Sequence, residues 1–184
     1  ANLMKRIVNP LGGATTLLYQ PSTAEGEAHS FLPLVIPVVR QVTVDNGMGW
    51  STTTHYLYRS GFFRREWHPD APHSGEFIGT AFDTWDFRGF REVTVIDPEG
   101  NRTKTIFEQF GPLTGRPSTV ETRDAQGRLF STTWNGWAVQ HIANGVHSVQ
   151  LTGQANFTYD GDDTFKRTET GFGYDAFGNL TGTV

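Results

Sequence analysis

The chain of 184 residues contains no cysteine, which excludes disulfide bridges and thiolate metal ligands. No window of about 12 residues places apolar side chains at the helical spacing i, i+3, i+4 and i+7, so helix is expected to be a minor component. Clusters of basic residues are also missing, because no more than two Lys or Arg residues are adjacent and the net charge is −4. We therefore expect no nucleic-acid partner.

Long hydrophobic runs are absent as well. The most apolar stretch, residues 31–39, is short and carries two prolines, so we expect no transmembrane segment. No basic-then-apolar leader precedes the first strand-like residues. The last five residues, 180–184, look like a strand cut in mid-course. We expect residues 1–184 to form a single β-rich segment of a larger protein.

The chain is instead rich in residues that break it into short pieces, with 21 glycines and 9 prolines. The longest stretch without either, residues 50–60, is dense in Thr and Tyr, which favour strands. Apolar and polar residues alternate with period two in several pieces, as in half-buried antiparallel strands with the apolar side inward. The alternating sets are Val42 and Val44; Tyr56 and Tyr58; Val93 and Val95; Phe130, Thr132 and Trp134; and Ala155, Phe157 and Tyr159.

Turn signals separate these pieces, and one pattern, Asp-x-x-Gly-(Asn/Arg), occurs three times. An aspartate side chain can accept a hydrogen bond from the backbone two residues on, and glycine adopts positive φ without steric cost. We assign structural turns to Asp97 and Gly100, Asp124 and Gly127, and Asp175 and Gly178, with Tyr174 preceding the last pair. Other turn signals are residues 9–13, 45–47, 135–136, 144–145 and 160–161.

These observations predict an all-β fold of roughly a dozen antiparallel strands. The hairpins are expected to join through the turns into a curved or spiralling sheet. The turn aspartates at 97, 124 and 175 are 27 and 51 residues apart, which favours hairpins of varied length over a uniform solenoid. Residues 68–79, rich in proline and glycine, are predicted to be a surface loop inserted between strands.

Several segments occur in the order found in one bacterial family. Residues 174–180 follow the YD-repeat pattern Tyr-Asp-x-x-Gly-(Arg/Asn)-Leu, although Asp124 is preceded by arginine. The chain resembles the Rhs/YD-repeat proteins, in particular the shell region of the B component of insecticidal toxin complexes. The other matching segments are Asn9-Pro10-Leu11-Gly12-Gly13, Leu32-Pro33-Leu34, Ser51-Thr52-Thr53-Thr54-His55-Tyr56, Phe87-Arg88-Gly89-Phe90 and Val93-Thr94-Val95 with Asp97-Pro98.

This resemblance implies a non-enzymatic part of a hollow shell that encloses a toxic polypeptide and delivers it to a target cell. It implies no catalytic, metal or cofactor-binding residues. The implied partners are the rest of the shell and the enclosed toxin, and the implied location is secreted or on the bacterial cell surface. Open strand edges also predict self-association of the isolated segment.

Two other functions are compatible with the composition. Large aromatic side chains can stack on sugars, so the chain could be an extracellular carbohydrate-binding or adhesion module, although such residues more often fill a sheet core. A polysaccharide hydrolase needs paired carboxylates, whose separation the sequence does not fix. The residues concerned are Trp50, Trp67, Trp85, Trp134 and Trp137 for stacking, and Glu66, Asp70, Asp83 and Asp86 for hydrolysis.

Smaller patterns have a simpler structural interpretation. His68, Asp70 and His73 could gather at a metal ion but fit a proline-stiffened loop better, and Asp160, Asp162 and Asp163 fit an acidic turn better than a calcium loop. Asp97-Pro98 resembles an aspartyl autoproteolysis site and is ordinary turn chemistry. Arg64, Arg65 and Arg88 are predicted to pair with Glu66, Asp83 or Asp86 across neighbouring strands.

Overall fold

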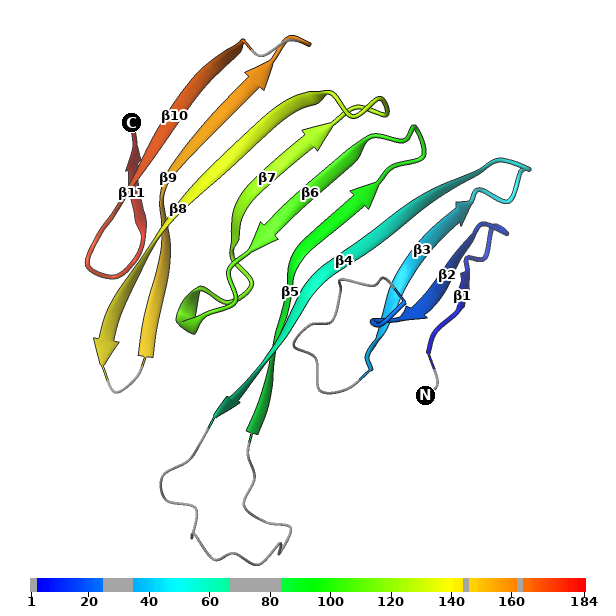
Figure 1. Cartoon of the computed structure of the whole chain (residues 1–184), viewed down its shortest axis with the longest axis horizontal. Helices are drawn as coiled ribbons and strands as arrows, with labels where there is room; N and C mark the ends of the chain where they lie inside the picture. Colours follow the sequence, from blue (N-terminus) through cyan, green and yellow to red (C-terminus); the bar gives the residue numbers. More distant parts are fainter. Residues whose placement is uncertain (1–2, 25–34, 67–83, 144–145, 162–163) are drawn as a thin grey trace, which may run out of the picture.

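The computed structural model describes residues 3–24, 35–66, 84–143, 146–161 and 164–184. Within these ranges, eleven strands form one antiparallel sheet in which every strand pairs with the next strand in the sequence (Figure 1). The predicted all-β fold of antiparallel hairpins is therefore confirmed. The strands are β1 (Arg6–Val8), β2 (Ala14–Pro21), β3 (Pro37–Asp45), β4 (Ser51–Glu66), β5 (Thr84–Ile96), β6 (Arg102–Phe107), β7 (Pro117–Arg123), β8 (Leu129–Ala143), β9 (Val146–Tyr159), β10 (Phe165–Tyr174) and β11 (Leu180–Thr183).

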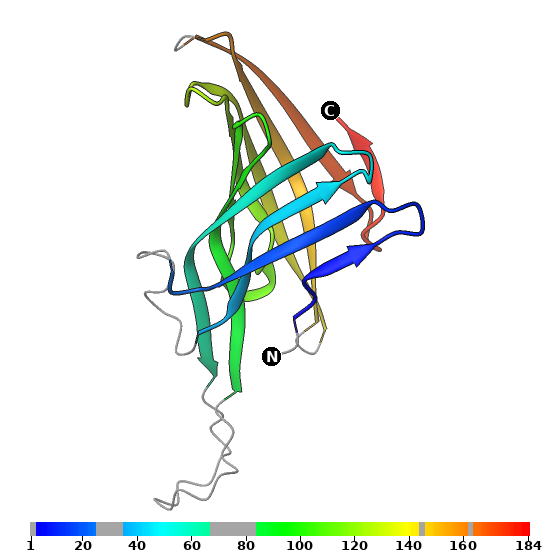
Figure 2. The same cartoon turned by 90° about the vertical axis from the view of Figure 1, so that its right-hand side faces the viewer.

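The sheet is curved and open. Figure 2 shows the two edge strands, β1 and β11, toward one side of the molecule, while β5 and the end of β4 lie toward the other. Strands twist in a right-handed sense, and bulges increase that twist locally. The register shifts in most of the ladders, including those of β4 with β5 and of β8 with β9. Twist and bulges together account for the bowed shape.

The sheet is a single layer. Among the described residues, no strand contacts another strand except its neighbours in the ladder. The buried apolar residues of the described ranges are accordingly few: Ala14, Val38 and Phe157. Val44, Phe130 and Trp134 were expected to point into a core, and this expectation is wrong, because they are exposed where no second layer covers the sheet. Stability must therefore come mainly from ladder hydrogen bonds and cross-strand side-chain pairs.

The register separates the two faces of the central sheet. Residues directly opposite each other on neighbouring strands share a face. One face carries a charged row (Arg59, Glu92, Lys104, Glu121 and Arg123). The other face carries a neutral row, formed by Tyr58, Val93, Thr105, Val120 and Thr133.

Helix is scarce in the described ranges, where a single short 3-10 turn, η1 (Gly111–Leu113), connects β6 to β7. No helix within those ranges has the length and apolar character needed to cross a bilayer.

One predicted turn is wrong. Asn135 and Gly136 lie inside β8, where they pair with Gln154 and Gly153 of β9. The glycine marks a register shift between Gly136 and Trp137, so the Asn-Gly pair identifies a bulge in a long strand instead of a hairpin end. The predicted turn at 144–145 and the predicted loop at 68–79 lie outside the described residues.

Candidate functional site

The three predicted Asp-x-x-Gly turns share one geometry. In each, the aspartate N–H donates to the carbonyl of the residue four positions later, at 3.0 Å. The glycine N–H donates back to the aspartate carbonyl at 2.9 to 3.1 Å. One carboxylate oxygen accepts the N–H of the residue four positions later at 2.8 to 2.9 Å, and the glycine φ is 84° to 90°. The turns span residues 97–101, 124–128 and 175–179.

The second carboxylate oxygen explains the fifth residue of the pattern. It accepts a side-chain N–H from Asn101 at 2.8 Å, from Arg128 at 2.6 Å and from Asn179 at 2.9 Å. Each aspartate is therefore satisfied on both oxygens by its own turn.

These hydrogen bonds favour the ionised carboxylates. The side-chain hydrogen bond from Asn101 lowers the pKa of Asp97, and that from Asn179 lowers the pKa of Asp175. Desolvation raises the pKa of Asp124, but the hydrogen bonds and charge of Arg128 outweigh it and leave that pKa below its usual value. The turns are thus most stable with their aspartates charged.

Two further turns in the described ranges have asparagine in place of aspartate: the turn at Asn9 has the same geometry, and the turn at Asn46 shares its side-chain hydrogen bonds and its closing backbone bond. The Asn9 side chain accepts hydrogen bonds from the N–H groups of residues 11 and 13 at 3.0 and 2.9 Å. The Asn46 side chain accepts those of residues 48 and 50 at 2.8 and 3.2 Å. Sequence reasoning identified bends here but missed the shared geometry, which an Asx residue followed three positions later by glycine would have revealed. The five Asx–Gly turns are 9–13, 46–50, 97–101, 124–128 and 175–179.

Four of these turns lie at the same end of the strands. They connect β1 to β2, β3 to β4, β5 to β6 and β7 to β8, and so form one rim of the sheet, called the turn rim (Figure 1). Neighbouring turns approach closely, because a Cβ atom on Gly47 would lie 2.8 Å from the carbonyl carbon of Gly12. A Cβ on Gly100 would lie 3.2 Å from the Cβ of Ala125. Glycine is needed here for the space as well as for its positive φ.

The opposite rim depends on residues 108–117, which are the connection between β6 and β7 together with the first residue of β7 and are called the bracket. Its Gln109 side chain, 7% exposed, donates hydrogen bonds to the carbonyls of Ser60 at 2.8 Å and Gly89 at 3.0 Å. Ser60 and Gly89 have φ of 52° and 82°, and the β4–β5 register shifts beside them. Gln109 therefore satisfies two carbonyls at a bend in the β4–β5 ribbon.

Other contacts fasten the bracket to the same ribbon. Arg88 donates to the Thr114 hydroxyl at 3.1 Å and pairs with Asp86 at 2.8 Å. The centroids of the Phe62 and Phe110 rings lie 5.4 Å apart. The predicted partner of Arg88 is therefore correct, but the predicted cross-strand geometry is wrong, because Arg88 and Asp86 lie two residues apart on β5, with both side chains on one side of that strand.

The bracket also holds the β8–β9 ribbon. The Pro117 carbonyl accepts hydrogen bonds from the Trp137 indole at 2.9 Å and from the Asn135 amide at 3.0 Å. The Arg116 guanidinium lies over the Trp137 ring, 5.4 Å from its centroid. One connection thus links the two ribbons that extend beyond their neighbouring strands.

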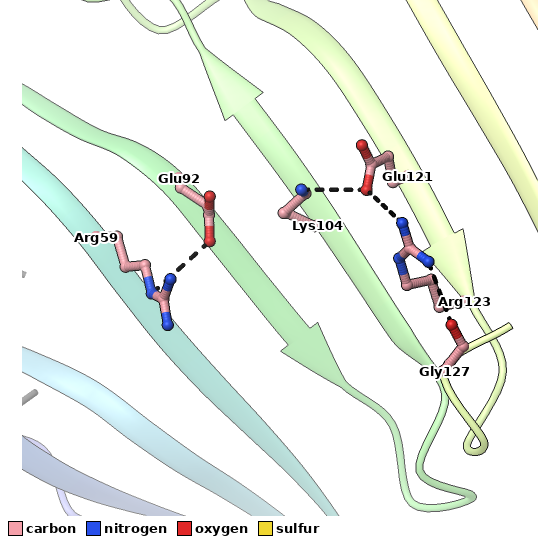
Figure 3. A network of polar contacts seen from close by, with 6 residues as sticks. All are labelled: Arg59, Glu92, Lys104, Glu121, Arg123 and Gly127. Carbon is pink, nitrogen blue, oxygen red and sulfur yellow. Dashed lines mark hydrogen bonds and ion pairs between the residues drawn. The ribbon is translucent and has the colours of Figure 1, made fainter. Parts of the chain in front are cut away.

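Charged side chains form two separate sets of contacts on the face of the charged row, one between β4 and β5 and one between β6 and β7 (Figure 3). Lys104 lies 3.1 Å from Glu121, which also contacts Arg123 at 3.5 Å. Arg59 approaches Glu92 at 3.9 Å. These partly exposed pairs contribute little stability each, so their main effect is to give this face its electrostatic character.

The predicted tryptophan platform is dispersed over the described part of the chain. Trp50 lies on the turn 46–50 and is 62% exposed. Trp134 is 54% exposed and packs 4.7 Å from the ring of Phe157 on β9, while Trp137 lies against the bracket. Trp67 and the side chain of Trp85 lie outside the described part.

The ionisable candidates do not converge in the described ranges. No group of three or more His, Asp or Glu residues there is arranged to hold a metal ion. Asp97 and Pro98 form an ordinary Asx–Gly turn. The remaining candidates, His68, Asp70, His73, Asp83, Asp162, Asp163 and the side chains of Arg65 and Glu66, lie outside the described part.

Two comparisons with known proteins found matches, one in sequence and one in structure. Residues 1–68 match the family model of the insecticide toxin TcdB middle/N-terminal region. The crystal structure of TcdB2-TccC3 without its hypervariable C-terminal region superimposes on 96% of the chain with a TM-score of 0.72 and 15% identity. The predicted resemblance to the toxin-complex B component is confirmed. The chain spans 12% of the length of that matched toxin-complex chain, and no curated protein matches it in sequence.

The two matches cover different lengths of the chain. The TcdB family match includes β1 to β4 and the first two Asx–Gly turns. The toxin-complex fold extends over 96% of the chain, and so beyond the part that the family model matches. The sheet as a whole therefore has a fold shared with a toxin-complex protein.

Proposed function

We propose that this chain is a non-enzymatic wall segment of a bacterial Rhs/toxin-complex-like shell, which encloses a toxic polypeptide for delivery and is secreted or displayed at the cell surface. The observation that carries the proposal is the single-layer, bowed and open sheet. Its fold matches a toxin-complex chain over 96% of the present chain. A layer without its own core is suited to separating two compartments. The Asx–Gly turns and the bracket hold the shape of that layer.

The partners follow from the same architecture. The open edges β1 and β11 present backbone groups that further strands of the shell would pair. In the isolated segment, the same edges would favour self-association. One face of the bowed sheet would meet the enclosed polypeptide and the other would meet solvent.

Limited proteolysis of the protein as its gene encodes it tests enclosure. An enclosed polypeptide is expected to resist a broad-specificity protease while the wall is folded, and to be degraded quickly once mild denaturant opens the wall. A polypeptide with the same cleavage rate before and after opening would contradict the proposal. No turnover of polysaccharide substrates is expected in a parallel assay.

Carbohydrate binding is a second candidate, favoured by the exposure of Trp50 and Trp134. Trp134 presents an indole beside Phe157 on an uncovered face, which is suitable for stacking on a sugar ring. A glycan array distinguishes the two functions. Binding that is lost in Trp134→Ala but kept in Phe177→Ala, another exposed aromatic, would favour the binding module over the wall.

A further inference from the structure

Two histidines lie directly opposite each other near the end of the β8–β9 ribbon. His141 and His147 are cross-strand partners, so their side chains share one face. Their ring centroids are 5.1 Å apart, the rings are nearly perpendicular at 79°, and both residues are exposed. The ribbon thus brings two imidazoles together before any ligand is bound.

We propose that His141 and His147 together bind one Zn²⁺ ion, a site beyond the proposed wall function. Zinc binds histidine nitrogens at about 2.0–2.1 Å with tetrahedral geometry, which places the centroids of two ligating imidazoles roughly 5.2 Å apart. The observed centroid separation of 5.1 Å matches this value.

The surrounding residues select the type of metal. Residues 137–143 and 146–153 include no Asp, Glu, Lys or Arg, so the ribbon offers imidazole nitrogen without carboxylate oxygen. Imidazole suits zinc and its transition-metal neighbours, whereas calcium and magnesium prefer oxygen ligands. Because both histidines are exposed, water can complete the coordination.

Bound zinc would join β8 to β9 at the part of the ribbon that meets the turn 175–179. Gln140, Ile142 and Ser148 line a cavity together with Ala176 and Phe177 of that turn. A metal link between His141 and His147 would therefore steady the surface on which the last Asx–Gly turn lies.

Titration of the full chain with Zn²⁺ alone, and with Co²⁺ as a coloured substitute, tests the site. One equivalent of zinc is expected to bind, and cobalt is expected to give the visible absorption of a tetrahedral complex. His141→Ala or His147→Ala should each weaken zinc binding at least about tenfold, because each removes one of two protein ligands. The matched control is His55→Ala in β4, which removes a histidine elsewhere and should leave binding unchanged.

Circular dichroism of each variant checks that the sheet is retained, which is expected because both histidines are exposed. The proposal is overturned if the wild-type chain takes up no zinc. It is equally overturned if the double variant His141→Ala/His147→Ala binds zinc as tightly as the wild type, which would place the metal at other residues.

Discussion

The two rims of this sheet are built in different ways. The turn rim consists of four short Asx–Gly turns, each closed by hydrogen bonds between residues no more than four positions apart. The opposite rim depends on the bracket, where Gln109 bonds Ser60 across 49 positions and Trp137 bonds Pro117 across 20. One rim repeats a local device, and the other is held by contacts that exist only in the folded sheet.

The difference shows how a single layer keeps its shape without a core. Local turns fix the spacing of the hairpins, because each is satisfied within itself. The bend of the longer ribbons needs an outside support, since Ser60 and Gly89 adopt positive φ in the middle of paired strands. Disruption of the bracket should therefore affect distant strands, whereas disruption of a turn should remain local.

The largest effect is expected at the bracket. Gln109→Leu removes both side-chain hydrogen bonds to Ser60 and Gly89 and leaves two carbonyls without that partner, at a cost of roughly 2–4 kcal/mol. The loss in free energy of unfolding is measured by urea denaturation, with circular dichroism as the signal. Gln150→Leu is the matched control, because the Gln150 side-chain nitrogen is buried without a hydrogen-bond partner in the described structure and its removal should cost little. Equal losses for the two variants would contradict the role of the bracket.

On the turn rim, glycine substitutions distinguish the effect of a steric clash with the neighbouring turn from the effect of a positive φ. Gly47→Ala places a methyl group against the backbone of Gly12 and also strains a φ of 75°, whereas Gly49→Ala strains a φ of 85° in open space. The strain alone costs roughly 1–2 kcal/mol, so Gly49→Ala should lose about that much and Gly47→Ala clearly more. Thermal unfolding of the pair checks the order. If Gly49→Ala were the more damaging variant, contact between neighbouring turns would have no importance.

A smaller effect is expected from Trp137→Phe. The change keeps an aromatic ring beneath Arg116 but removes the indole hydrogen bond to Pro117, worth about 1 kcal/mol. Trp134→Phe is the comparison, since Trp134 is more exposed and packs through its ring. The midpoint of urea unfolding should fall in the first variant and stay nearly constant in the second.

The smallest effect is expected on the dependence of stability on acidic pH. The lowered pKa values of Asp97, Asp124 and Asp175 mean that their stabilising contribution is present above the unfolded pKa and is lost as pH falls through the lower folded values. Replacing all three by asparagine, as in the natural turn at Asn9, should flatten the dependence of stability on pH below about 4. Denaturation midpoints across that acid range measure the slope. An unchanged slope would show that the turn aspartates carry no acid sensitivity.

The sequence was sufficient for the local part of the structure. Alternation predicted the antiparallel hairpins, and the Asp-x-x-Gly-(Asn/Arg) pattern located Asp97, Asp124 and Asp175 in turns, because each such turn is closed by its own residues. The same reasoning misjudged Asn135 and Gly136, since the signal of a two-residue hairpin can also arise at a bulge within a long strand.

The bracket could not be predicted in this way. Gln109 has no local pattern, and its partners Ser60 and Gly89 become neighbours only after β4 and β5 have paired. The exposure of Phe130 and Trp134 was missed for a related reason, because alternation indicates which residues share a face but not whether another layer covers that face. The cross-strand pair His141 and His147 likewise depends on the register of β8 and β9.

The most direct test of a wall is to compare its two faces in the protein as its gene encodes it. The chain has no cysteine, so single cysteines can replace Thr94 on the face of the charged row and Thr105 on the face of the neutral row. Both threonines are half-buried and lie on adjacent central strands. A bulky thiol reagent should modify one of the two rapidly and the other only after denaturation. Rapid modification of both in the native protein would contradict the account.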